Sequence, residues 1–371
     1  MLHRLTSLLP RLEHAPGIFA AATTAGLATV VASQLPSNLH ISAVPVSIVL
    51  GAVVGNVAPS AVTTLIKPGV GYATSMILRS GIVCVGAKLS AAQIAALGWT
   101  TVPAAACSVG AGIAVIPVLA ARFGLAPRLG ALLACGTSIC GVTAISAVAP
   151  AIGATQAEVA IAVANVVAFG SVGLLLYPHV ASALFPKSDS QSIGLFLGLA
   201  VHDTAQVMGC AASYAEQYSD TAVVAAAAVA KLTRNVFLAA VVPFMAVRHG
   251  AAVGGVTAKT LAAAVPAFVG GFLAMAAIRT AGDYQLANGS HALFVFEPLV
   301  WKSAADWVGG FLGTKVLLGT GLAGVGLSVN AAAFSGAGLA PFAVGAAGAL
   351  IVGGVGLSVA LLASSLKPAL A

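Results

Sequence analysis

The chain alternates between long apolar runs and short polar connections. A spanning α-helix needs about 20 mostly apolar residues to cross the hydrocarbon core of a bilayer. Eleven runs come close to that length: residues 16–35, 42–58, 68–89, 99–121, 129–150, 157–178, 192–213, 221–247, 260–279, 310–329 and 340–365. The pattern predicts an all-α, polytopic transmembrane helical bundle of about 10–12 spans.

Residues 280–309 depart from this pattern. Four charged residues interrupt them: Asp283, Glu297, Lys302 and Asp306. Trp301 and Trp307 belong to a residue type that gathers at headgroup depth. We expect an interfacial segment or loop here, with a twelfth, weak element as the alternative.

The composition supports a membrane protein. Hydrophobic residues make up 60% of the 371 positions and charged residues only 7%, whereas an ordinary soluble domain is about 25% charged. Lipid accepts apolar side chains on the outside of a protein, and the 42 glycines suit close packing of membrane helices. We expect residues 1–371 to form a single integral membrane domain.

The net charge of +7 comes from basic residues that stand singly or in pairs between apolar runs, which excludes a nucleic-acid surface. With the N-terminus inside, the outer loops before residue 279 carry essentially no Lys or Arg apart from Lys88 at a helix end, whereas the inner segments carry eight of the 16: Arg4, Arg11, Lys67, Arg122, Arg128, Lys187, Arg248 and Lys259. Since positive charge marks the inner side, a cytoplasmic N-terminus in the cell membrane is predicted. The apolar run from Gly17 to Leu35 is long enough to be a retained first span.

Nothing in the sequence indicates enzymatic chemistry. The five cysteines lie in apolar stretches without the spacing of metal ligands. No nucleophile–base pair or phosphate-binding loop is evident. We therefore expect neither an enzyme, nor a cofactor, nor a metal site.

Residues 136–143 form the first polar group inside a span. This stretch contains Gly136, Thr137, Ser138, Gly141 and Thr143, which are poor material for a continuous lipid-facing helix. A helix break would turn backbone N–H groups and hydroxyls inward, and a half-helix N-terminus would attract an anion. A packing seam of small residues is the alternative.

The second group lies in the seventh run and contains His202, Asp203, Thr204 and Gln206. His202 and Gln206 are four residues apart, so a continuous helix would have one strongly polar face. An Asp beside a His can relay a proton or bind a cation, which suits coupling or gating. The alternative is a fixed Asp–Arg pair that only holds helices together.

The third group is the pair Lys231 and Arg234, three residues apart near the middle of the eighth run. Two cations at this depth require counter-charge, and Asp203 is the carboxylate at comparable depth. The balance leaves one excess positive charge, which an anionic substrate would complete. Snorkelling of both side chains to the interface is the alternative.

One internal similarity suggests an inverted repeat. Residues 81–98 align with residues 321–338, and each block ends a span and precedes the next apolar run. The two blocks lie an odd number of spans apart, as inverted repeats of secondary transporters do. Chance similarity between helices rich in Ala and Gly is the alternative.

The three polar groups, in this order, resemble the UPF0324 family of bacterial membrane proteins, whose members are grouped as sulfate exporters. The resemblance rests mainly on three motifs: Gly136-Thr-Ser-Ile-Cys-Gly141, His202-Asp-Thr-Ala-Gln-Val207 and Lys231-Leu-Thr-Arg234. It covers most of residues 16–240. Residues 250–309 match poorly, and Gly86-Ala-Lys-Leu-Ser90 has Lys where the family has Arg.

The resemblance implies a fold similar to the cation/proton-antiporter and bile-acid-symporter group, with interrupted core helices, and export of a small sulfur oxyanion. Together with the residues, it predicts a secondary transporter of a small anion that uses alternating access. A proton or a sodium ion could be the coupling ion, and a homodimer is compatible. The alternatives are a cation/proton antiporter that uses Asp203 and a non-transporting membrane scaffold.

Overall fold

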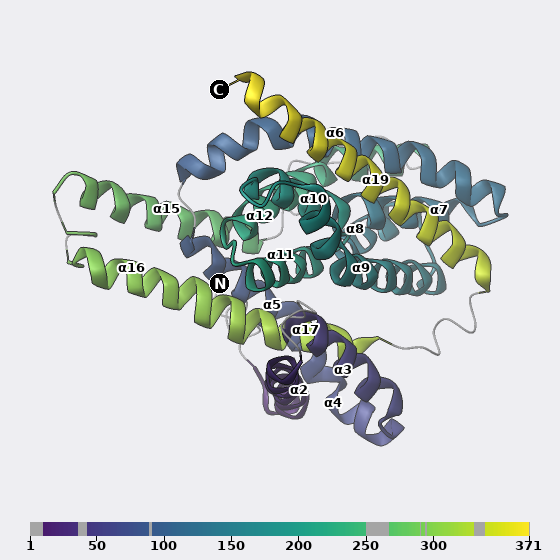
Figure 1. Cartoon of the computed structure of the whole chain (residues 1–371). Helices are drawn as coiled ribbons and strands as arrows, with labels where there is room; N and C mark the ends of the chain where they lie inside the picture. The colour runs from purple at the N-terminus through teal and green to yellow at the C-terminus, as the bar shows by residue number, and fades with distance from the viewer. Residues whose placement is uncertain are drawn as a thin grey trace. The chain divides into compact units, whose positions relative to one another are not determined.

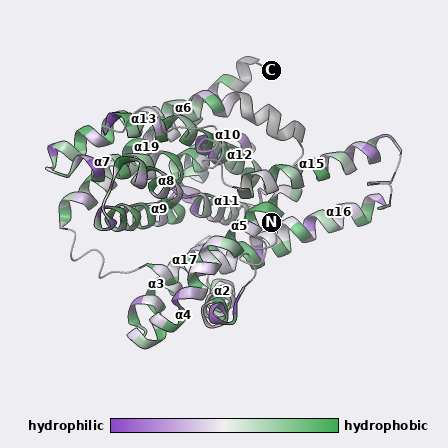
Figure 2. Ribbon diagram, turned by 180° about the vertical axis from the view of Figure 1, so that it is seen from behind, coloured by the Kyte–Doolittle hydropathy of each residue, from purple (hydrophilic) through white to green (hydrophobic). Residues whose placement is uncertain are grey.

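The computed structural model describes residues 10–35, 43–88, 91–249, 267–289, 291–293, 295–329 and 338–370, and the side chains of 91–99, 267, 269 and 367–370 lie outside this description. The described residues are almost entirely helical and contain no strand. Seven of their helices are long and apolar enough to cross a membrane. Hydrophobic colour runs along most of the helices in Figure 2. The prediction of an all-α polytopic bundle is confirmed.

The chain divides into two compact units. Unit 1 comes from Met1–Ile94 and Ala267–Asn330, and unit 2 from Ala95–Pro266 and Ala331–Ala371. The polar groups predicted from the sequence all fall in unit 2.

Unit 1 combines helices from its two chain segments (Figure 1). Its elements are η1 (Leu12–His14), α2 (Ala15–Gln34), α3 (Ala43–Val57), α4 (Ser60–Tyr72), η3 (Ala73–Ile77), α5 (Leu78–Val85), η4 (Gly86–Lys88), α15 (Ala267–Ala287), α16 (Pro298–Asp306), η7 (Trp307–Leu318) and α17 (Gly319–Ser328). The segments η3 and η7 are π-helical, and each joins the helices before and after it into a longer helix.

Both blocks of the predicted repeat begin in unit 1, in α5 and α17, and each of these helices follows a π-helical segment. Residues 89–90 and 330–337 of the blocks lie outside the described residues. The inverted repeat stays a prediction.

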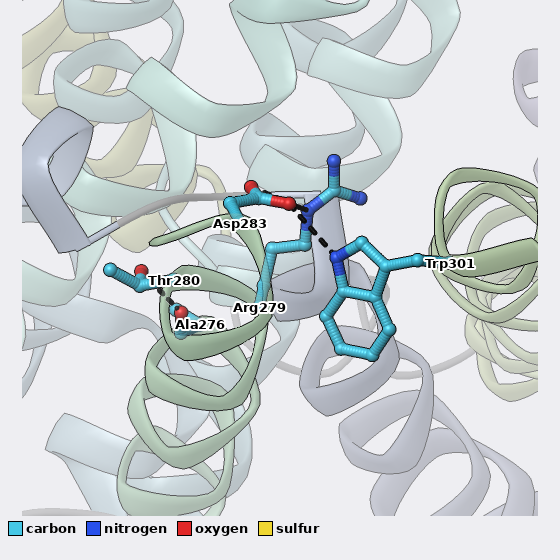
Figure 3. A network of polar contacts seen from close by, with 5 residues as sticks. All are labelled: Ala276, Arg279, Thr280, Asp283 and Trp301. Atoms are coloured by element: carbon cyan, nitrogen blue, oxygen red, sulfur yellow. Dashed lines mark hydrogen bonds and ion pairs between the residues drawn. The ribbon is translucent and has the colours of Figure 1, made fainter. Parts of the chain in front are cut away.

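Residues 280–309 differ from the predicted interfacial segment. Residues up to Ala287 complete α15, and α16 begins at Pro298, so only a short connection separates two helices that run side by side (Figure 1). Three polar residues of these helices, Arg279, Asp283 and Trp301, bond to one another (Figure 3). Arg279 Nε donates to both oxygens of Asp283 at 2.9 and 2.8 Å, and Trp301 Nε1 donates to Asp283 Oδ1 at 2.9 Å.

Glycines allow the helices of unit 1 to approach closely. A Cβ atom on Gly69 of α4 would lie 2.6 Å from the Cα of Gly17 in α2, and closer still to the carbonyl oxygen of His14. Since lipid provides no hydrophobic drive between helices, such contacts between small residues stabilise the packing.

Unit 2 contains the helices that carry the predicted site. Its elements are α6 (Ala91–Arg122, from Ala95), α7 (Pro127–Cys135), η5 (Gly136–Cys140), α8 (Val142–Ile152), α9 (Gln156–Leu184), α10 (Ser190–Ala200), α11 (Thr204–Tyr218), α12 (Ala222–Val236), α13 (Leu238–Arg248) and α19 (Leu339–Leu370).

Helix α10 lies at the centre of unit 2, between α12 and α19. Every residue from Ser192 to Ala200 is buried, as expected for a helix that is hydrophobic all round. Gly194 and Gly198 permit the contact with α12, because a Cβ atom on either would overlap an alanine of that helix. At its start, Asp189 accepts hydrogen bonds from the backbone N–H of Ser192 (3.1 Å) and from Ser364 of α19 (2.6 Å).

We predict that Gly69→Ala destabilises the protein by about 1–3 kcal/mol, because the added methyl group forces α2 and α4 apart. Gly71→Ala, two residues further along the same helix, is the matched control, since its Cβ atom would meet nothing within 4 Å. Thermal unfolding in detergent measures both. Equal midpoints for the two variants would contradict the described contact.

Candidate functional site

The first helix break lies between η5 and α8. Gly136–Cys140 forms a π-helical turn, and Gly141 has φ +64° and ψ −127°. Residues with a Cβ atom rarely adopt this backbone conformation, so glycine is required where the chain leaves one helix and enters the next. Gly136 to Cys140 are all buried. The interruption predicted for this stretch is present, and it lies at Gly141.

The second break lies between α10 and α11. Val201 and Asp203 have extended backbones, with ψ of 140° and 148°, and α11 begins only at Thr204. The prediction that His202 and Gln206 share one face of a continuous helix is wrong, because His202 precedes α11. Asp203 is the N-cap of α11, and its Oδ2 accepts a hydrogen bond from the backbone N–H of Ala205 at 2.9 Å.

Arg234 of α12 connects the two breaks. Its side chain is fully buried. It donates five hydrogen bonds to backbone carbonyls: Nε to Ser138 (2.9 Å), Nη2 to Thr137 (2.9 Å), and Nη1 to Gly198 (3.2 Å), Leu199 and Val201 (3.1 Å). Two of these acceptors belong to η5 and three to the end of α10 and the residue after it.

Lys231, one turn earlier in α12, also donates hydrogen bonds to carbonyls of both breaks. It is fully buried, and its Nζ donates to the carbonyl oxygens of Ile139 (2.7 Å), Val201 (3.2 Å) and His202. The three N–H groups of an ammonium match these three acceptors. Figure 1 shows α10, α11 and α12 gathered together within unit 2, which brings the cations to both breaks.

These eight bonds, five from Arg234 and three from Lys231, explain how the cations are stabilised at this depth. The last carbonyls of a helix have no partner within it and carry partial negative charge. The residue types predict only carboxylates and substrate as counter-charge, whereas in the structure backbone carbonyls accept from both cations. Substrate contact by Lys231 and Arg234 stays a prediction.

Asp203 lies at the opposite, N-terminal ends of the interrupted helices. Besides capping α11, it lies against Gly141, where a Cβ atom would be 2.7 Å from Asp203 Oδ1. The carboxylate is therefore close to the start of both α8 and α11, whose first N–H groups carry partial positive charge. Asp203 is half-buried.

His202 is buried, and its Nδ1 lies 3.2 Å from the carbonyl oxygen of Thr137. Because a carbonyl oxygen only accepts, this contact requires a proton on Nδ1. His202 therefore bonds the segment between α10 and α11 to the turn η5.

The other predicted residues occupy different positions. Thr143 is half-buried in the first turn of α8, and Thr204 is the buried first residue of α11. Gln206 points away from the break, since its Nε2 donates to Val167 O (2.9 Å) and Ser171 Oγ (3.1 Å) of α9. The structure thus brings the turn η5, Gly141, Asp203 and the two cations together, and leaves Gln206 outside.

Comparison with known proteins identifies the family of the chain. The sequence model of a family described as "Conserved hypothetical protein 698" matches residues 16–345. A UPF0324 membrane protein of Pseudomonas aeruginosa is 31% identical over 89% of each chain. The chain belongs to the UPF0324 family of membrane proteins. Further UPF0324 relatives come from Listeria monocytogenes, 28% identical over 79% of this chain and 80% of the relative, and from Ralstonia nicotianae, 31% identical over 70% and 73%.

No solved structure matches the chain. Membership of the UPF0324 family and the apolar helices make it a multi-pass integral membrane protein.

We predict that Arg234→Lys destabilises the protein although it keeps the charge. One ammonium cannot replace the fork of donors that reaches carbonyls of both breaks, and each buried carbonyl left unpaired costs about 1–3 kcal/mol. Thermal unfolding in detergent measures this loss. Arg248→Lys, at an exposed position near the end of α13, is the control and should leave the midpoint unchanged. Similar midpoints for both variants would contradict the role given to Arg234.

We also predict that Gly141→Ala destabilises the protein more than Gly153→Ala. Both glycines have positive φ, but an added Cβ at Gly153 meets nothing within 4 Å, whereas at Gly141 it displaces Asp203. Backbone strain costs about 1–3 kcal/mol at such a position, and the displaced carboxylate adds to it. The comparison again uses thermal unfolding. A smaller loss for Gly141→Ala would show that Asp203 is not held against this glycine.

Proposed function

We propose that the protein is a secondary transporter that exports or exchanges a small anion of the sulfate or sulfonate class by alternating access. The observation that carries this proposal is the meeting of two interrupted helices in unit 2, with Lys231 and Arg234 on their carbonyl ends and Asp203 at their amide ends. In transporters, interrupted helices form cargo sites because they present backbone groups at membrane depth.

The charge balance favours an anion. Each interrupted helix contributes one carbonyl end and one amide end, so the partial charges of the helix ends cancel. Lys231 and Arg234 contribute two positive charges and Asp203 one negative charge, which leaves a net charge of +1 (2 − 1) at the breaks. The other acidic residues of unit 2 lie at helix ends, away from this site: Glu158, Asp189, Glu216 and Asp220.

The first turn of α8 offers suitable groups for the cargo. Its N–H groups lie at the positive end of a helix, and anions bind readily at such ends. Thr143 adds a half-buried hydroxyl in the same turn. The anion would lie here, where Lys231 and Arg234 act through their charge while they hold the carbonyls.

A cation/proton antiporter is the second candidate. It is favoured by Asp203, which is the carboxylate at the breaks and is only half-buried, whereas both cations are committed to carbonyls. In this reading Asp203 binds the transported cation or a proton in turn. The third candidate function is a membrane scaffold, in which the hydrogen bonds from Lys231 and Arg234 only stabilise the fold.

The proposal includes the cell membrane as the location, a cytoplasmic N-terminus, a proton or sodium ion as the coupling ion and a homodimer as one assembly. The distribution of Lys and Arg supports the orientation.

We predict that Asp203→Asn keeps or increases anion flux in proteoliposomes, because it removes the one negative charge from the site and retains a side chain that can cap α11. Uptake of labelled sulfate and of a small sulfonate is the measurement. Thr143→Val, which replaces the hydroxyl by a methyl group of similar size, should lower the flux of the same anions at unchanged protein stability.

Cation-dependent proton movement that is lost in Asp203→Asn, without any anion flux in the unaltered protein, would replace the proposal by the antiporter. Variants of Lys231 and Arg234 are unsuitable for this distinction, because either reading predicts that they damage the fold. No flux of either kind in a stable protein would leave the scaffold.

A further inference from the structure

Among the described residues of unit 2, four side chains are buried with no hydrogen-bond partner on any polar atom. They are Ser108 of α6 (0% exposed), Ser138 of η5 (0%), Ser192 of α10 (1%) and Asn235 of α12 (3%). In Asn235 both atoms of the amide lack a partner. Asn165 and Gln206 differ, because each still donates through its amide nitrogen. Since nearly all buried polar groups in proteins are hydrogen-bonded, these side chains need an explanation.

Helix α12 and the turn η5 both contact one face of α6. At one end of this face, the hydroxyl of Thr101 lies 3.3 Å from that of Thr233 in α12. At the other end, Gly112 packs against Ser138, whose Oγ would touch a Cβ atom placed on this glycine. Ser108 is seven residues after Thr101 and four before Gly112, so it lies on the same face. Its hydroxyl is therefore enclosed between α12 and η5.

Asn235 lies on a different face of α12. It follows Thr233, which contacts α6, by two residues, and residues two apart do not share a helix face. It lies four residues after Lys231, on the helix face that carries this cation. Ser108 and Ser138 are thus the two unpartnered hydroxyls on either side of Gly112, where α6 meets η5.

We infer that water occupies the region between α6 and η5 and hydrogen-bonds to Ser108 and Ser138. Hydroxyl groups both donate and accept, as water does. A metal ion is a poorer match, because neither residue is a carboxylate or a histidine. This hydrated compartment is separate from the anion site proposed at α8, and it does not depend on transport.

The test is the reactivity of a thiol placed at position 108 towards 2-aminoethyl methanethiosulfonate in protein reconstituted in liposomes. Ser108→Cys is compared with Val109→Cys, the neighbouring residue, which is 3% exposed and belongs to the apolar core of unit 2. Both carry Cys107→Ser, which removes an exposed thiol. Peptide mass mapping reads the modification at each position.

Because the thiolate forms only where water reaches it, we expect position 108 to react on the order of tenfold faster than position 109. Equal, slow reaction at both positions would overturn the inference. Failure of anion flux in the unaltered protein would leave this result unaffected, so the two proposals fail separately.

If the cysteine variants do not fold, Ser108→Ala decides the question by its unfolding midpoint. In a dry site, removal of an unpaired hydroxyl stabilises the protein and raises the midpoint. In a hydrated site, it removes a hydrogen bond to water, and the midpoint stays the same or falls. A rise relative to Ser146→Ala, an exposed serine of α8, would refute bound water.

Discussion

The structure depends on one requirement: the backbone carbonyls released where a membrane helix breaks must find donors inside the protein, because lipid offers none. Arg234 and Lys231 meet this requirement for both breaks with eight hydrogen bonds. Their burial is tolerable for the same reason, since the carbonyl ends of two helices face them. The broken helices thus need the two cations as hydrogen-bond donors, and the buried cations need the carbonyls of the breaks as acceptors.

Other features of unit 2 follow from this arrangement. The cations reach both breaks only if α12 lies close to α10, and Gly194 and Gly198 allow that approach. Gly141 permits the turn into α8 and leaves room for Asp203. The amide ends of α8 and α11 are then the polar groups that the proposed anion would meet, beside a net charge of +1.

The sequence predicted the helices well because each apolar run has the length of a span. It also predicted the first break, since Gly136, Gly141 and the hydroxyl residues between them are poor helix formers. The sequence did not predict the second break, because Leu195–Val207 is mostly apolar. A signal was present, since Asp203 before the apolar run of α11 is typical of a helix N-cap. The hydrogen-bond partners of the cations could not be predicted. Every residue has a backbone carbonyl, so the sequence does not show which carbonyls accept from Lys231 and Arg234.

A similar cause explains residues 280–309. Arg279 and Asp283 lower the hydropathy of α15 and imitate a loop, but they are four residues apart and neutralise each other on the helix (Figure 3). Trp301 was expected to act through its preference for the interface. In the structure it also donates a hydrogen bond to Asp283 that joins α16 to α15.

The most direct test of the account is counterflow of labelled sulfate into proteoliposomes loaded with unlabelled sulfate. Counterflow requires only an anion site that opens to each side in turn, so no coupling ion needs to be known. The account predicts a transient accumulation of label above equilibrium, which a sulfonate suppresses by competition. Label that only equilibrates at the rate of protein-free liposomes, for sulfate and for sulfonate alike, would contradict an anion site at the paired breaks.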